Sequence, residues 1–108
     1  MPTVANTLEG LAHPQRIRIV GALAEGRQYV SELARRLGMN RPLLHMHLRR
    51  LERAGLVESS LELSPEGKAM RFYSVVQFDI HLTPGSVATA ALEAVNASST
   101  ANSAPDHD

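Results

Sequence analysis

Arginine is the residue type with the clearest chemical signal, and it is concentrated in the first half of the chain. The 108 residues have no net charge at pH 7, but residues 13–53 hold nine arginines and three glutamates, whereas residues 54–108 hold two basic and seven acidic residues. Residues 35–50 contain five arginines and no acid. Such a local cationic excess attracts the phosphates of nucleic acids, although a solvated helix face can have the same composition.

Residues 40–54 are predicted to form a helix with one cationic and one apolar side. Arg41, His45 and Arg49 follow one another at intervals of four and share the cationic side. The apolar side consists of Leu44, His47, Leu48 and Leu51. The amino end of a helix favours anions, and a guanidinium group suits both phosphates and the O6 and N7 atoms of guanine. We therefore expect helix 40–54 to enter the major groove of double-stranded DNA.

Residues around this helix complete the candidate DNA-binding set. Basic side chains on neighbouring segments are predicted to contact phosphates, which positions a protein without reading sequence. Leu43 and Met46 are candidates for contact with thymine methyl groups, and packing beneath the preceding helix is the alternative for both, more so for Leu43. The full set is Arg35, Arg36, Asn40, Arg41, Pro42, Leu43, His45, Met46, Arg49, Lys68 and Arg71.

Apolar spacing predicts two helices before residue 26. The first covers residues 3–12 and is weakened by Gly10, because glycine disfavours helix interiors. The second begins at Pro14, which suits a first helical turn, and ends at Gly26. Its predicted inward face is Ile17, Val20, Leu23 and Ala24.

A third helix precedes helix 40–54 across a short turn. Ser31 is its predicted N-cap and Gly38 its end, while Asn40 is predicted to cap the next helix. Its inward face is Leu33, Ala34 and Leu37. Two helices joined in this way form a helix-turn-helix, although helical hairpins without DNA-binding function share the arrangement.

Residues 56–76 are predicted to form a β-hairpin wing. The segments 56–63 and 69–76 favour strands, and Ser64-Pro65-Glu66-Gly67 matches a type I turn. The alternative is a helix that begins at Pro65 with Ser64 as its cap. An extended segment, 78–82, and a last helix from Pro84 follow. The last helix directs Val87, Ala91, Leu92 and Val95 toward a partner surface.

The predicted fold is mainly α with a small β-hairpin (α+β), in the order four helices, two strands and a last helix. We expect one domain over residues 1–97 and a disordered tail over 98–108, which has almost nothing apolar to bury. No apolar run reaches the roughly 18–20 residues that span a bilayer, so no membrane association and a cytoplasmic location are expected. The absence of cysteine excludes disulfides, thiolate metal sites and thiol switches.

Three segments together resemble the ArsR-type winged-helix repressors. They are residues 11–20 (LAHPQRIRIV), 31–40 (SELARRLGMN) and 47–57 (HLRRLERAGLV), and the resemblance extends over roughly residues 4–95. The resemblance implies a homodimer paired through residues 3–12 and 84–97 that binds a palindromic operator and represses transcription. The family commonly has serine at the position of His45 and a small polar residue at that of Leu43, so its base preferences do not transfer.

The metal sites of the family's sensors are incomplete in this sequence. Of their Asp-x-His pattern only Asp79 and His81 are present, and Leu92 stands where the spacing would place histidine. On a strand the two side chains would share one side, with Glu93 or His107 as a third ligand. Because zinc normally needs three or four ligands, we expect no metal and no cofactor, with Asp79 and His81 the only weak candidates.

Two other function classes are weighed against a DNA-binding regulator. An enzyme is not expected, because no paired carboxylates, phosphate-binding glycine loop or Ser/His/Asp set is present outside the predicted tail. A winged-helix module that binds an acidic protein partner is the main alternative. A nonspecific architectural protein is disfavoured, because such binders usually carry an overall cationic excess.

Overall fold

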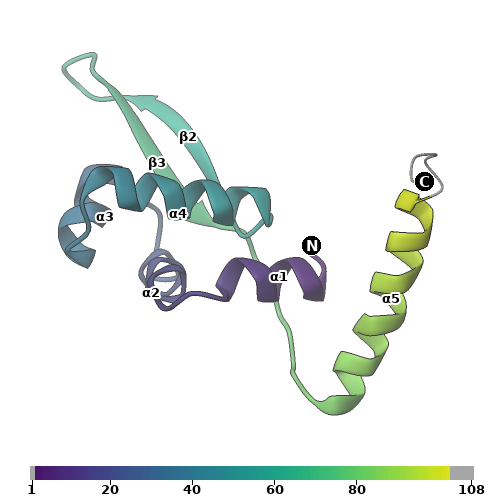
Figure 1. The fold of residues 1–108 in the computed structure, drawn as a ribbon. Helices are drawn as coiled ribbons and strands as arrows, with labels where there is room; N and C mark the ends of the chain where they lie inside the picture. The colour runs from purple at the N-terminus through teal and green to yellow at the C-terminus, as the bar shows by residue number, and fades with distance from the viewer. Residues whose placement is uncertain (1, 103–108) are drawn as a thin grey trace. The chain divides into compact units, whose positions relative to one another are not determined.

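The computed structural model describes residues 2–102, which divide into two compact units. The boundary in the chain lies between Phe78 and Asp79. Figure 1 shows the helices and strands of both units. The first unit contains α1 (Val4–Leu11), α2 (Pro14–Leu23), β1 (Gln28–Tyr29), α3 (Val30–Leu37), α4 (Arg41–Arg53), β2 (Val57–Leu63) and β3 (Ala69–Val75). The second contains α5 (Pro84–Asn102). This is an α+β winged helix-turn-helix, as predicted, with one additional short strand.

The turn between α3 and α4 follows the predicted signals. Gly38 adopts the left-handed conformation with φ 66°, and the backbone N–H of Met39 donates to the carbonyl of Ala34 at 3.0 Å. This is the glycine-terminated helix end that residues with a Cβ disfavour. The Asn40 side chain then accepts the backbone N–H of Leu43 at 2.8 Å and caps α4. The predictions for Gly38 and Asn40 are confirmed.

The predicted N-cap at Ser31 is wrong, because α3 begins at Val30 and its N-cap position is Tyr29, two residues before Ser31. Tyr29 occupies the cap position without a side-chain cap hydrogen bond and is paired with Phe72 in the sheet. Val30 is buried in the core. Strand pairing and burial therefore determine where α3 starts, and Ser31 lies inside its first turn.

The wing is a β-hairpin with a third strand at its edge. β2 and β3 pair antiparallel from Val57 opposite Val75 to Leu63 opposite Ala69, and the sheet order is β1-β3-β2. In the connecting turn, Gly67 has φ 81° and its N–H donates to the Ser64 carbonyl at 2.8 Å. The predicted hairpin is confirmed, and the alternative helix from Pro65 is absent in this described segment.

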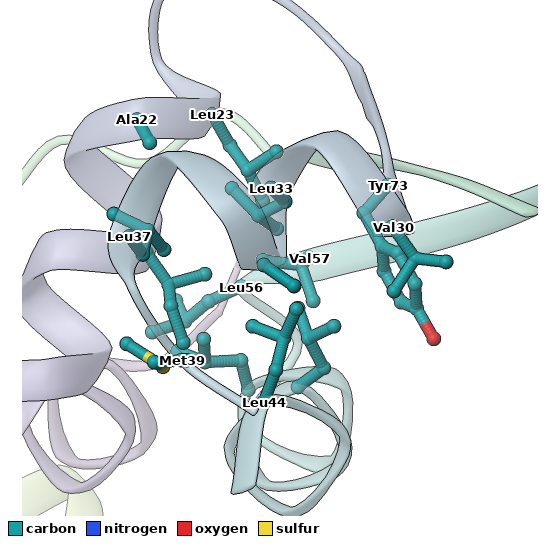
Figure 2. Close-up of a cluster of buried hydrophobic side chains, with 14 residues drawn as sticks. Ala22, Leu23, Val30, Leu33, Leu37, Met39, Leu44, Leu56, Val57 and Tyr73 are labelled. Carbon is teal, nitrogen blue, oxygen red and sulfur yellow. The ribbon is translucent and has the colours of Figure 1, made fainter. Parts of the chain in front are cut away.

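The core lies where α2, α3 and α4 meet the base of the hairpin. Leu44, Leu48 and Leu51 of α4 are completely buried, as predicted. Figure 2 shows the cluster, with Leu44 labelled among side chains from α2, α3 and the hairpin. The buried apolar side chains are Ile19, Ala22, Leu23, Val30, Leu33, Ala34, Leu37, Met39, Leu44, Leu48, Leu51, Leu56, Val57 and Tyr73.

The predicted inward face of α2 is only partly correct. Leu23 is buried and Val20 half-buried, but Ile17 is 56% exposed and Ala24 is exposed. The residues that α2 buries are Arg16, Ile19, Ala22 and Leu23. α2 is therefore rotated so that Arg16, although it is not apolar, enters the interior on the same side as Ile19 and Leu23.

Residues 76–83 span the boundary between the two units and are neither helix nor strand. They include residues 78–82, which were predicted to be extended. Thr83 and Ser86 then cap α5 reciprocally, each side-chain oxygen accepting the other residue's backbone N–H at 3.0 and 2.9 Å. α5 continues to Asn102 and so includes residues 98–102 of the predicted tail, since extending a formed helix needs no new nucleus. The remainder of that tail, 103–108, lies outside the described residues and stays a prediction.

Gly10 provides a test of the packing of α1. A Cβ atom at this position would lie 2.6 Å from Cδ1 of the fully buried Leu56 and 2.9 Å from Cβ of Ala54. We expect Gly10→Ala to lower the free energy of unfolding by about 1–3 kcal/mol through overpacking.

Gly21→Ala is the matched control, because a Cβ there meets nothing within 4 Å. The control should stabilise the protein by about 0.4–1 kcal/mol in urea denaturation. Equal effects of the two substitutions would contradict the close approach.

Candidate nucleic-acid interface

The cationic side of α4 faces solvent because the leucine side faces the core. Arg41 and Arg49 are exposed, Met46 is 45% exposed, and His45 is half-buried. Leu43 is also half-buried and packs against the hydrophobic core. The packing interpretation therefore accounts for Leu43. On the outward side of α4, exposed Arg41 and Arg49 lie on either side of half-buried His45.

The amino end of α4 carries three of the candidate residues. Arg41 donates a hydrogen bond from Nη2 to Oγ of Ser31, which links the first turns of α3 and α4. Pro42 is exposed in the first turn of α4. The Asn40 oxygen accepts the hydrogen bond of the helix cap, and the two N–H donors of its amide nitrogen are available to a ligand. Ser31 was not predicted to contact the DNA-binding set, and no pattern within α3 or α4 indicates its hydrogen bond with Arg41.

Arg35 and Arg36 are both exposed near the end of α3, but they differ in their partners. Nη2 of Arg36 lies 2.7 Å from the carboxylate of Glu25. A phosphate would have to replace this carboxylate, whereas no carboxylate in the described part of the chain is paired with Arg35. The two arginines line a shallow depression with Gln28 and Glu32.

The wing is tied to α4 through a hydrogen-bonded chain. Arg71 on β3 donates from Nη1 to Oγ of Ser59 at 3.0 Å, and the Ser59 hydroxyl donates to Glu52 of α4 at 3.4 Å. Lys68 is exposed beside the turn. The guanidinium of Arg71 is therefore held against the hairpin by Ser59, which in turn links the hairpin to α4.

An ion pair across the three-stranded sheet joins Arg27, the residue before β1, to Glu62 of β2. Arg27 hydrogen-bonds the carboxylate of Glu62 and lies 4.3 Å from the centre of the Phe72 ring. The hydrogen bond from Arg27 holds the pKa of Glu62 below its usual value. Because both side chains are about half exposed, solvent screens this ion pair. Its main effect is to orient the two side chains over the sheet.

A buried polar cluster connects α1, α2 and α4 behind the cationic stripe. Arg16 donates from Nε to the Gly10 carbonyl at 2.7 Å, and its Nη1 lies 3.3 Å from Nδ1 of His47. The rings of His13 and His47 lie 4.6 Å apart. Because Nδ1 faces a guanidinium donor, we assign the His47 proton to Nε2, which is buried without a hydrogen-bond partner in the described structure. Spacing could have indicated Arg16, since it repeats with Ile19 and Leu23 at i, i+3, i+7.

The weak metal candidates are not assembled into a site in the part of the chain that the structure describes. Asp79 and His81 are exposed in a segment without regular secondary structure. Across residues 2–102, no group of three His, Cys, Asp or Glu side chains is placed to hold an ion. Within the same residues, no helix combines the length and apolar character that crossing a bilayer requires.

Burial, and then the nearby charges of His13, Arg16 and Arg50, lower the pKa of His47. The folded protein therefore binds a proton at His47 less readily than the unfolded chain does. The contribution of neutral His47 to the free energy of unfolding is fully present above pH 6.5 and is lost as the pH falls below that value. We expect the free energy of unfolding to decrease on acidification from pH 7, measured above about pH 5, where carboxyl groups stay ionised. His47→Gln keeps an acceptor for Arg16 and should give a shallower pH dependence. An unchanged slope would contradict this role.

Comparison with known proteins places the fold and the sequence in one family. The sequence profile of the bacterial regulatory protein, arsR family, matches residues 13–59. An HTH-type transcriptional regulator of Methanocaldococcus jannaschii is 38% identical over 74 residues, 68% of this chain and 77% of the relative.

Two solved structures extend the likeness to most of the chain. The transcriptional repressor BigR of Xylella fastidiosa is 33% identical with a TM-score of 0.60, covering 92% of this chain and 85% of BigR. A homodimeric winged helix-turn-helix DNA-binding domain of Mycobacterium bovis is 27% identical with a TM-score of 0.59, covering 97% of this chain and 87% of that domain. The chain thus belongs to the ArsR family of bacterial regulatory proteins and is a winged helix-turn-helix transcriptional regulator.

Proposed function

We propose that the chain is a homodimeric repressor that acts in the cytoplasm and binds a two-fold symmetric operator. α4 lies in the major groove, and the β2–β3 hairpin lies along flanking phosphates. The observation that carries the proposal is the outward side of α4, where exposed Arg41 and Arg49 flank half-buried His45, because burial of the opposite side directs it to solvent. No catalytic role is part of the proposal, since the family and the structural neighbours are transcriptional regulators.

Specific and nonspecific contacts are assigned by position. Arg41 and Arg49 are the candidates for guanine contacts, because a guanidinium can donate two parallel hydrogen bonds to O6 and N7. His45 and Met46 lie between them on the exposed side. Arg35, Lys68 and Arg71 are candidates for phosphate contacts that set the register of the protein on the duplex.

A dimer is supported by apolar side chains that the monomer leaves in solvent. Leu8 of α1 is 38% exposed, and Val87 and Leu92 of α5 are 49% and 69% exposed. The Mycobacterium bovis neighbour is described as homodimeric. We propose that residues 3–12 and 84–97 pair two copies, which would hold two α4 helices about one turn of DNA apart.

Selection of bound genomic fragments by the purified protein tests the function directly. At near-physiological salt, we expect enrichment of a palindromic motif whose half-sites are about one helical turn, or 10–10.5 base pairs, apart. A folded, dimeric protein that enriches no motif would contradict the proposal and favour the module that binds an acidic protein partner.

Arg41→Ala separates base recognition from phosphate attraction. On the selected motif we expect a loss of about 1–3 kcal/mol in binding free energy and relaxed preference at one position of each half-site. Lys68→Ala is the comparison, with a uniform loss on the motif and on a scrambled duplex. Fluorescence anisotropy with both duplexes at several salt concentrations measures the two effects. Full retention of sequence preference in Arg41→Ala would refute the assignment.

The dimer interface is tested on α5 without removing core residues. Val87→Asp combined with Leu92→Asp should convert dimers to monomers and weaken operator binding, because the two half-sites would no longer be linked. Thr89→Asp is the matched control, since Thr89 is exposed on the same helix and polar. Sedimentation equilibrium gives the association state. A double variant that stays dimeric would show that α5 is not the main interface.

A further inference from the structure

A small cavity between α1 and the carboxyl end of α4 is unused by the proposed DNA contacts, and its α1 wall belongs to the segment 3–12 that we propose pairs two copies. It has a volume of about 180 Å³. Arg53 is the last residue of α4, at the opposite end of the helix from Arg41. The cavity is lined by Asn6, Glu9, Gly10, Arg50, Arg53 and Ala54.

Charged groups on the two walls face the cavity without neutralising one another. Arg50 and Arg53 are one turn apart on α4, and Asn6 and Glu9 are one turn apart on α1. In the described part of the chain, the ion pairs within 4.0 Å are Arg27 with Glu62 and Arg36 with Glu25, and neither involves this cavity. The walls therefore present two cations, one anion and one amide.

The wall formed by α1 is held firmly in place. Gly10 lies so close to Leu56 and Ala54 that a Cβ atom would collide with both. The Gly10 carbonyl also accepts the hydrogen bond from buried Arg16. These contacts fix the spacing of the two walls, and a site that is formed before binding loses less entropy when a ligand enters.

We propose that this cavity binds a small zwitterion of the α-amino-acid type. Its carboxylate would lie between the guanidinium groups of Arg50 and Arg53, which suit planar carboxylates, and its ammonium group would face Glu9 and the Asn6 amide oxygen. A simple anion would leave the Glu9 carboxylate opposite a like charge. The volume is below the roughly 300–1,000 Å³ of pockets for drug-sized ligands, which favours a ligand with few heavy atoms.

Occupancy of the cavity would regulate DNA binding, a consequence that rests on the proposed function. Arg50 and Arg53 belong to the helix that we propose lies in the major groove. The ligand has no net charge, but its carboxylate would lie against these two guanidinium groups and its ammonium group farther away, beside Glu9, so the positive field of the two arginines is reduced. We expect the ligand to lower operator affinity about fivefold or more, and operator DNA to lower ligand affinity by the same factor.

Isothermal titration calorimetry of the full chain with single α-amino acids tests the site. We expect at least one of them to bind saturably, with one ligand per chain, and acetate, methylamine and inorganic phosphate to bind more weakly. Arg50→Gln, Arg53→Gln and Glu9→Gln should each abolish binding, whereas Glu58→Gln, at an exposed acid on β2, should retain it. Urea denaturation confirms that each variant is folded.

The ring protons of His47 give a second, spectroscopic measurement. Arg50 is one of the charges that lower the pKa of His47, so a carboxylate at Arg50 should raise this pKa in an NMR titration. A purely structural role of the two arginines would not produce this shift.

Several results would overturn the inference. Binding that survives Arg50→Gln and Arg53→Gln would do so, as would acetate or phosphate binding as tightly as every amino acid. The absence of binding by any amino acid, or a change of association state as the only effect of the arginine variants, would also refute it.

If an operator is bound normally in those cases, only the cavity inference fails. If an amino acid binds but no DNA motif is enriched, the proposed function fails and the ligand site stands.

Discussion

The burial of one side of α4 is the constraint on which the candidate interface depends. Leu44, Leu48 and Leu51 are completely buried, and each such side chain contributes about 1.5–3 kcal/mol relative to exposure. Any rotation of α4 that turned Arg41 or Arg49 inward would bring these leucines into water. Hydrophobic packing on the inner side therefore determines which cations face solvent, although the leucines themselves touch no ligand.

A buried polar cluster adds directional restraint to this packing. Leucine contacts tolerate small sliding movements, whereas the guanidinium of Arg16 must meet both the Gly10 carbonyl and the His47 ring. A buried charge that lost either partner would remain desolvated without compensation, which is costly. Arg16 thus fixes how α1, α2 and α4 meet, and His47 connects that junction to the helix that carries the cationic stripe.

The features that local spacing controls could be predicted from the sequence, and those set by tertiary contacts could not. The apolar side of α4, the Gly38 helix end and the Ser64–Gly67 turn all depend on residues close together in the chain, and all were predicted. The start of α3 was missed because it depends on β1 pairing with β3, and the rotation of α2 was missed because an arginine occupies an interior position.

The exposed residues of α4 were predicted from the sequence, but their hydrogen-bond and ion-pair partners were not. The contacts of Arg41 with Ser31 and of Arg36 with Glu25 require the folded chain.

The neutral total charge is compatible with DNA binding because acids and cations are distributed unequally over the fold. In the described structure, Glu62 and Glu25 are paired with Arg27 and Arg36, so part of the acidic charge holds arginines at the edges of the wing and of α3. Over the same residues, Arg41 and Arg49 have no carboxylate within ion-pair distance. Charges act mainly within a Debye length of about 8–10 Å in physiological salt, so a phosphate near α4 experiences these two guanidinium groups more strongly than the sum over the chain. Among the candidate arginines, those on α4 therefore start from a more favourable position for phosphate and base contacts than Arg36, which must first exchange one anion for another.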